Sequence, residues 1–253
     1  MPVIEVNGVV TREVRYGENS RILTVLAEDA GKISVLAGRA RTNRSGLLTA
    51  TQLFSYSNFS LFKGRENSLL KLNEGQVIQA FADIRLSLSK MAYASYFCDI
   101  VNHICAEGAE ENQMLKLLLN ILYKLALSYE TDKGEAMKLE TVFLLKTLVN
   151  TGFAPNCDGC ARCGADSGIR LFLPGEGVFL CGDCRKDNRG YEVNDNLYRA
   201  MRHIINAQGS AMFAFSLGEK SSRYLAAICE ECMRYQLEKD LGTLDYLKKV
   251  RDM

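Results

Sequence analysis

The sequence predicts an α+β protein, in which an N-terminal five-stranded OB-like β-barrel precedes an α-helical domain with an inserted cysteine-rich segment. Short β-branched and aromatic runs fill residues 1–80, and helical periodicity begins near residue 84. Five of the nine cysteines lie within residues 157–184. Because the strands come before the helices and do not alternate with them, the order favours α+β over a doubly wound parallel sheet.

The barrel prediction comes from five apolar runs that Gly, Asn, Asp and Ser clusters separate. The residues Asp29–Lys32 are typical of a hairpin turn between the second and third runs. Five antiparallel strands within about 80 residues fit a small closed barrel, most often an OB barrel, although an SH3-like barrel fits nearly as well. The predicted strands are VIEVNGVV, RILTVLA, KISVLA, TATQLFSYSNFSLF and LLKLNEGQVIQAF.

Apolar residues at helical spacing predict three helices within residues 84–152, with Gly152 as a stop signal. Helices resume after the cysteine segment, where Asn194 or Asp195 is suited to cap the first of them. The cysteine segment is therefore expected as an insertion within a helical domain.

A last helix is expected from Glu219 to Leu241, with Gly242 ending it. The predicted domains are an OB-type nucleic-acid-binding barrel at 1–80 and a helical domain at 81–253. The zinc-binding insertion of the helical domain is placed at about 155–190.

Composition is that of an ordinary soluble globular protein, with 253 residues, 47% hydrophobic and 24% charged. The N-terminal MPVIEVNGVV lacks the features of a signal peptide, so we expect a reducing compartment. The apolar run from Leu115 to Leu127 contains polar interruptions and is expected as a buried helix. In a reducing compartment, paired CxxC motifs bind zinc more often than they form disulfides.

Two CxxC pairs separated by a loop predict a zinc-ribbon-like site. A glycine, Gly164, follows the pair CARC and permits the tight turn that presents sulfur to a metal, whereas Ala161 follows the overlapping pair CDGC. Four thiolates fill a tetrahedral site, so we expect the zinc to be structural rather than catalytic. The predicted ligands are Cys160, Cys163, Cys181 and Cys184, with Cys157 as the alternative first ligand.

Basic residues gather in the barrel region. From Lys32 to Lys71 the chain has seven basic residues and a single acid, Glu66, within a protein whose net charge is only +1. This asymmetry indicates a polyanionic partner bound through its phosphates, with Tyr16 available to stack on a base. OB barrels bind ligand beside the first and fourth interstrand loops, here TREVRYGENS and KGREN. The candidate DNA contacts are Arg12, Arg15, Tyr16, Lys32, Arg39, Arg41, Arg44, Lys63 and Arg65.

The sequence contains no P-loop, no GxGxxG, no HExxH and no GxSxG. This favours a binding protein over an enzyme, and the closed metal site argues against a zinc-dependent enzyme in particular. An alternative function is a zinc-stabilised protein–protein adaptor with no direct DNA role.

The order of these features resembles the RecO family of recombination-mediator DNA-repair proteins. The resemblance covers nearly the whole chain and includes the opening barrel, FAPNCDGCARCG followed by GEGVFLCGDC, and the closing helix YQLEKDLGTLDYLKKV. Since the family usually has an apolar residue where Cys157 stands, the resemblance implies Cys160 as the first zinc ligand.

The resemblance also implies a function without enzymatic turnover. It implies a bacterial, cytoplasmic and nucleoid-associated protein that binds single- and double-stranded DNA without sequence specificity and promotes strand annealing. With RecR as partner, such a protein assists RecA loading on DNA coated by single-strand-binding protein.

Overall fold

The computed structural model describes residues 2–38, 47–64, 69–129, 133–186 and 188–253. The chain folds into two compact units, one formed by Met1–Glu130 with Leu241–Met253 and the other by Thr131–Asp240. No helix in the described part of the chain has both the length and the apolar character needed to span a membrane.

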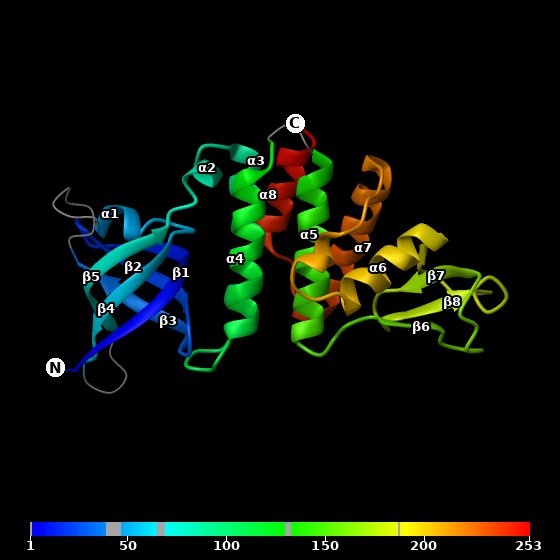
Figure 1. Ribbon diagram of the computed structural model, residues 1–253, viewed down its shortest axis with the longest axis horizontal. Coiled ribbons are helices and arrows are strands. Elements are labelled where there is room, and N and C mark those ends of the chain that lie inside the picture. The colour runs from blue at the N-terminus through cyan, green and yellow to red at the C-terminus, as the bar shows by residue number, and fades with distance from the viewer. Residues whose placement is uncertain (1, 39–46, 65–68, 130–132, 187) are drawn as a thin grey trace. The chain divides into compact units, whose positions relative to one another are not determined.

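A closed barrel of five strands begins the first unit, with strand order β1-β2-β3-β5-β4 (Figure 1). The parallel pair formed by β3 and β5 stands among antiparallel pairs, and β1 closes the barrel by pairing with both β2 and β4. This Greek-key arrangement is of the OB type and confirms the predicted fold class. The strands are β1 (Val3–Tyr16), β2 (Ser20–Ala27), β3 (Gly31–Ala37), β4 (Tyr56–Phe62) and β5 (Leu70–Gln79).

Alternation of side chains along these strands fills the barrel interior. Every second residue of β2, from Leu23 through Val25 to Ala27, is fully buried. Phe59 and Leu61 of β4 pack into the same core, again two residues apart. Apolar residues at a spacing of two therefore explain both the strands and their closure around one core.

The strand β1 is longer than predicted. Residues Arg12 to Tyr16, expected within a loop, pair with β2, so that only a short turn containing Gly17 separates the two strands. A bulge at Thr11 lets β1 change direction between its pairing with β4 and this second pairing. The loop prediction was wrong because polar, charged side chains on an exposed hairpin conceal the alternation that marks a strand.

A second difference lies before β4. The expected continuous strand TATQLFSYSNFSLF is wrong, because the short helix α1 (Leu47–Ala50) precedes it and the strand begins only at Tyr56. The Thr51 hydroxyl donates a hydrogen bond to the Leu47 carbonyl at 2.7 Å and closes the helical turn. Phe54 is buried at φ 72°, outside the extended region, so it ends any strand there.

Helices complete the first unit. Ser87 caps α3 by accepting a hydrogen bond from the Lys90 amide, and the Lys90 ammonium donates to the Ala126 carbonyl at the end of α4. The expected helix through Leu241 is wrong, since helix α7 (Glu219–Leu237) ends earlier and Gly242 starts another helix that packs on α3. The helices are α2 (Ala82–Arg85), α3 (Leu88–Ile104), α4 (Asn112–Leu127) and α8 (Gly242–Arg251).

The second unit combines three α-helices with a four-stranded sheet of order β6-β8-β7-β9 (Figure 1). Asn194 caps α6 by accepting a hydrogen bond from the Leu197 amide at 2.9 Å, as one of the two predicted caps. The buried Lys146 donates to the Ile205 carbonyl at the other end of α6. The elements are α5 (Lys133–Asn150), β6 (Asn156–Cys160), β7 (Ile169–Leu173), β8 (Val178–Cys181), β9 (Tyr191–Glu192), α6 (Asp195–Asn206), the 3₁₀ helix η1 (Gly209–Phe213) and α7 (Glu219–Leu237).

Within the first unit, the turn between β2 and β3 packs against the segment that joins α3 to α4. The Asp29 backbone amide donates a hydrogen bond to the Asn112 Oδ1, and the Asn112 Nδ2 donates one to the Asp29 carboxylate. The backbone of Gly31 approaches Ala109 closely. A Cβ atom on Gly31 would lie 1.9 Å from the Ala109 carbonyl oxygen. Only glycine fits this contact, which fixes the barrel against its own helices.

We expect Gly31→Ala to lower the free energy of unfolding by roughly 2–4 kcal/mol, because the methyl group forces the two backbones apart. Gly17→Ala is the matched control, since Gly17 also has positive φ but open space around it. We expect Gly17→Ala to lower the free energy of unfolding by only about 1 kcal/mol. Urea unfolding followed by circular dichroism measures both, and equal losses would show that the Gly31 contact contributes nothing.

Candidate metal centre and nucleic-acid interface

The first pair of cysteines lies at the end of β6, where the chain makes a tight turn. The Cys160 amide donates a hydrogen bond to the Ala165 carbonyl at 2.7 Å, and the Gly164 amide donates to the Cys160 carbonyl at 2.8 Å. Gly164 has φ 76°, a conformation that glycine adopts without steric cost. The turn therefore holds Cys160 and Cys163 on the same side of the chain.

The second pair forms a similar turn at the end of β8. The Arg185 amide donates to the Cys181 carbonyl at 3.1 Å, and the Gly182 amide donates to the Gly168 carbonyl at 3.0 Å. Because β8 pairs with both β6 and β7, the sheet holds the second turn beside the first.

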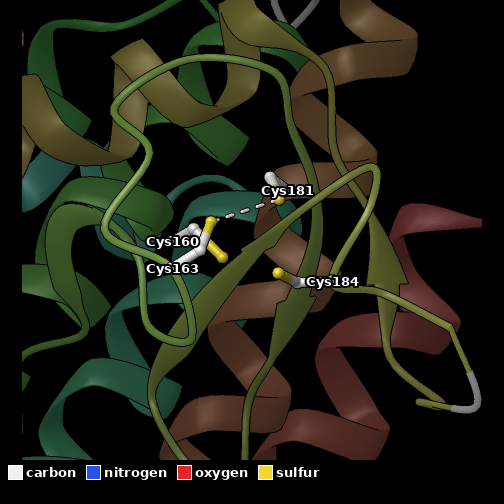
Figure 2. A group of neighbouring side chains, drawn as sticks. All are labelled: Cys160, Cys163, Cys181 and Cys184. Atoms are coloured by element: carbon white, nitrogen blue, oxygen red, sulfur yellow. Dashed lines mark hydrogen bonds between the residues drawn. The ribbon is translucent and has the colours of Figure 1, made fainter.

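The four sulfur atoms converge at this place, and Figure 2 shows their side chains pointing toward one another. All four lie within 4.8 Å of one another, and the Cys163 and Cys181 sulfurs are 3.7 Å apart. A tetrahedral zinc ion with Zn–S bonds near 2.3 Å requires sulfurs about 3.8 Å apart. The donor set and its spacing therefore fit one tetrahedral metal ion.

The local electrostatics favour thiolate formation at one of these residues. Burial by itself raises the pKa of the Cys160 thiol, but hydrogen bonds from the backbone amides of Cys181, Cys163 and Arg162 lower it to about 6. Hydrogen bonds with Cys181 and Cys163 raise the pKa of Cys184 to about 12. A thiolate therefore forms readily at Cys160, whereas a cation that binds Cys184 must displace its proton.

Cys157 lies apart from this group of four sulfurs. Asn156 and Cys160 pair with consecutive residues of β8, so Cys157 occupies a bulge between them. Its side chain is buried, and burial raises the pKa of its thiol to about 12. The Tyr198 hydroxyl donates to the Cys157 carbonyl at 2.7 Å and holds this part of β6 against α6. The structure thus brings together the four favoured ligands and leaves Cys157 in a packing role.

The four remaining cysteines also lie in the interior. Cys229 and Cys232 form a CxxC on α7, but both are buried, and burial is the main cause of their raised pKa. Cys98 and Cys105 are likewise buried. These residues behave as small apolar side chains.

The barrel is strongly staggered, and its pairing determines which basic residues lie together. A row of directly paired residues starts in the second half of β1 and returns to the beginning of the same strand. The row is Val14, Ile22, Leu36, Lys71, Phe62 and Val3. The tip of the β1–β2 hairpin, the end of β3, the end of β4 and the start of β5 therefore lie at the same end of the barrel, called here the basic end.

Four of the predicted DNA contacts are described at the basic end, and all four are exposed. Arg12 and Tyr16 lie on one face of the β1–β2 hairpin, because residues four apart on a strand share a face. Arg15 lies on the other face with Glu13. Lys63 directly follows Phe62, which pairs with Lys71. The Tyr16 side chain is 55% exposed, so its ring is available for stacking.

Lys32 does not belong to this group. It lies beside the β2–β3 turn, whereas the basic end contains the other end of both strands. Its ammonium donates a hydrogen bond to the Asn102 carbonyl of α3 at 2.7 Å. The sequence grouped Lys32 with the other basic residues because they are close along the chain, but the direction of the strands separates them. The hydrogen bond to Asn102 joins the barrel to α3.

Arg39, Arg41, Arg44 and Arg65 lie outside the described residues. The described residues that flank them include Ala37, which pairs with Arg21, and Lys63. Both flanking positions belong to the basic end. Among the barrel residues that the structure describes, acids and bases are equal in number: Arg12, Arg15, Arg21, Lys32, Lys63 and Lys71 against Glu5, Glu13, Glu18, Glu28, Asp29 and Glu74. The other charged residues of the barrel region are the four arginines and Glu66. The positive excess of the barrel region therefore comes from those arginines.

The structure adds two basic residues that the sequence alone did not assign to the site. Lys71 is exposed and belongs to the paired row at the basic end. Arg21 lies opposite Arg15 and forms a salt bridge of 2.8 Å with Glu13. Arg21 belongs to the hairpin itself, whereas Lys71 comes to this end through the pairing of β3 with β5. That pairing joins distant parts of the chain, so no local motif indicates it.

Comparisons with known proteins bear on the whole chain. Residues 1–81 match the family described as "Recombination protein O N terminal", and residues 85–245 match "Recombination protein O C terminal". A DNA repair protein RecO from Acetivibrio thermocellus is 34% identical over 254 aligned positions, which cover 99% of this chain and 98% of the relative. The protein of that name from Alkaliphilus metalliredigens is 33% identical, with 98% and 100% covered. That from Clostridium acetobutylicum is 27% identical over the full length of both chains.

Zinc content tests the ligand set of the candidate metal centre. We expect Cys181→Ser to lose the zinc ion, because three thiolates and a hydroxyl bind zinc far more weakly than four thiolates. Cys157→Ala is the matched control and should keep about one zinc ion per chain, with a stability loss of roughly 1 kcal/mol. Purified protein is assayed by metal analysis. Zinc retained in Cys181→Ser, or lost in Cys157→Ala, would contradict the assignment.

Proposed function

Because the chain belongs to the RecO family of DNA repair proteins, we propose that it is a recombination mediator that binds DNA without sequence specificity. The observation that carries this proposal is the basic end of the barrel, where exposed cationic side chains surround the β1–β2 hairpin. Such a surface binds both single- and double-stranded DNA, because phosphates are common to both.

Each basic side chain at this end neutralises a phosphate and releases a counterion. Arg12, Arg15, Lys63 and Lys71 are the described contributors. In the sequence, Arg39, Arg41, Arg44 and Arg65 give the barrel region its excess of positive charge. Tyr16, exposed at the tip of the hairpin, stacks on an unpaired base. None of these contacts distinguishes one base sequence from another.

Strand annealing follows from the same chemistry. Two complementary strands repel each other through their phosphates, and a protein that neutralises both reduces that repulsion without covering the base edges that must pair. The protein therefore acts by binding, without catalytic turnover. In the bacterial cytoplasm, with the nucleoid as its place of action, it assists RecA loading together with RecR on DNA coated by single-strand-binding protein.

The metal that the four cysteines hold is proposed to be structural Zn²⁺. Zinc accepts four thiolates in tetrahedral geometry, and the sulfur spacing fits its bond lengths. Since all four positions are filled by sulfur, the ion has no place for water or substrate. The chain's own contribution is to hold the turns after β6 and β8 together.

Charge removal at the basic end should weaken DNA binding. We expect Arg15→Gln with Lys71→Gln to lower affinity for a mixed-sequence single strand by roughly tenfold at low salt. The slope of log affinity against log salt should become shallower by about 1 to 2. Lys116→Gln with Lys220→Gln is the matched control, because it removes the same charge from exposed helical positions. Fluorescence anisotropy measures both.

If the two double variants bind equally well, the basic end is not the binding site. If the unaltered chain binds no DNA at all, the result favours the alternative of a zinc-stabilised protein–protein adaptor. Circular dichroism of each variant verifies that the barrel is intact.

A further inference from the structure

The four sulfurs of the candidate metal centre differ in their access to solvent. Cys160 and Cys181 are buried, with 3% and 6% of their surface exposed, and Cys184 is half-buried. Cys163 is exposed at the turn that follows β6. Of the four residues, Cys163 is therefore the one most open to a small molecule in solution.

We propose that Cys163 and Cys181 form a thiol-oxidation site, at which a hydroperoxide converts the metal-binding cluster into a disulfide and expels the metal. The Cys163 sulfur is the exposed reaction partner, and the Cys181 sulfur, 3.7 Å away, is the buried one that completes the bond. This property does not depend on DNA binding.

The chemistry balances in two steps. The Cys163 thiolate attacks the hydroperoxide, the O–O bond breaks, a proton goes to the leaving oxygen as water or an alcohol, and a sulfenic acid remains. The Cys181 thiolate then attacks that sulfur, the S–O bond breaks, and a second proton leaves with the oxygen as water. Two thiolates are oxidised and one hydroperoxide is reduced, while the zinc ion keeps its charge and departs because two of its four ligands are lost.

The site has geometric support beyond the exposure of one cysteine. The Cys163 and Cys181 sulfurs are already in contact, so a small movement brings them to the S–S bond length of about 2.05 Å. The Arg162 guanidinium, which lies in the turn after β6, donates to the Cys184 carbonyl and to the Asn188 side chain, so it holds the two turns beside each other.

The other five cysteines serve as an internal reference. All are buried within the two units, so a dissolved oxidant has no access to their sulfurs in the folded chain. A general effect of oxidant on any thiol would modify them as well. Oxidation confined to the four cysteines of the cluster therefore distinguishes a specific oxidation site from general oxidation of thiols. These residues are Cys98, Cys105, Cys157, Cys229 and Cys232.

A Cys163–Cys181 bond would keep the two turns joined after the metal has gone. Cys163 belongs to the turn after β6, and Cys181 ends β8, so the new bond replaces a metal bridge by a covalent one. Cys160 and Cys184 then remain as free thiols. The oxidation is reversible, because a thiol reductant reduces the disulfide and added zinc restores the original cluster.

The test uses the full-length, zinc-loaded chain and hydrogen peroxide. Zinc release is followed with a chromogenic chelator, and disulfides are located by alkylation and peptide mapping. We expect about one zinc ion released for each disulfide formed, with Cys163 and Cys181 in the same cross-linked peptide. Addition of a reductant and zinc should return the metal content to its starting value.

Two variants distinguish the role of the exposed Cys163 sulfur from that of the cluster as a whole. Cys163→His and Cys184→His each give a Cys₃His donor set, which zinc accepts in structural sites. Peroxide-driven zinc release should slow roughly tenfold or more in Cys163→His and much less in Cys184→His.

Equal release rates in the two variants would overturn the proposal, as would a disulfide mapped to any of the five buried cysteines. Retention of zinc in the unaltered chain at peroxide levels that oxidise a free surface thiol would also overturn it. If a histidine variant binds no zinc, peptide mapping of the unaltered chain decides the question alone.

Discussion

The bulge at Thr11 is the constraint on which the first unit depends. It lets β1 pair with β4 along its first half and with β2 along its second half, so a single strand closes the barrel and also extends into the β1–β2 hairpin. The Thr11 hydroxyl donates to the Asn102 side chain at 2.7 Å and holds this bend against α3. The stagger that results brings Arg15 and Lys71, distant in sequence, to the same end of the barrel.

The second unit depends on a different kind of constraint, namely two short turns held side by side by a sheet. Each turn fixes two sulfurs locally, and the pairing of β6 with β8 brings the two pairs together. The sheet also has a core of its own, in which Phe172 and Phe179 are fully buried and Phe179 contacts Tyr198 of α6. The same geometry leaves Cys163 exposed, whereas Cys160 and Cys181 are buried.

Local patterns in the sequence predicted much of this, and their limits are physical. The spacing of cysteines and Gly164 was enough to choose the four cysteines whose sulfurs converge, because each turn is a local structure. Position along the chain did not predict where Lys32 lies, because the direction of the strands places it at the other end of the barrel from the basic end. The prediction that Gly242 ends the last helix was also wrong, since a glycine that follows one helix can stand at the start of another. Register and topology depend on pairs of distant residues, which single-sequence periodicity does not contain.

The central claim is that the basic end of the barrel binds DNA through its phosphates. The most direct test is fluorescence anisotropy of a labelled mixed-sequence oligonucleotide, titrated with the intact chain across a range of salt. About five phosphate contacts on a single strand predict a fall in affinity of roughly 100-fold between about 50 and 200 mM salt. The fall should be the same for oligonucleotides of unrelated sequence. Absence of binding at low salt, or an affinity that does not change with salt, would contradict the account.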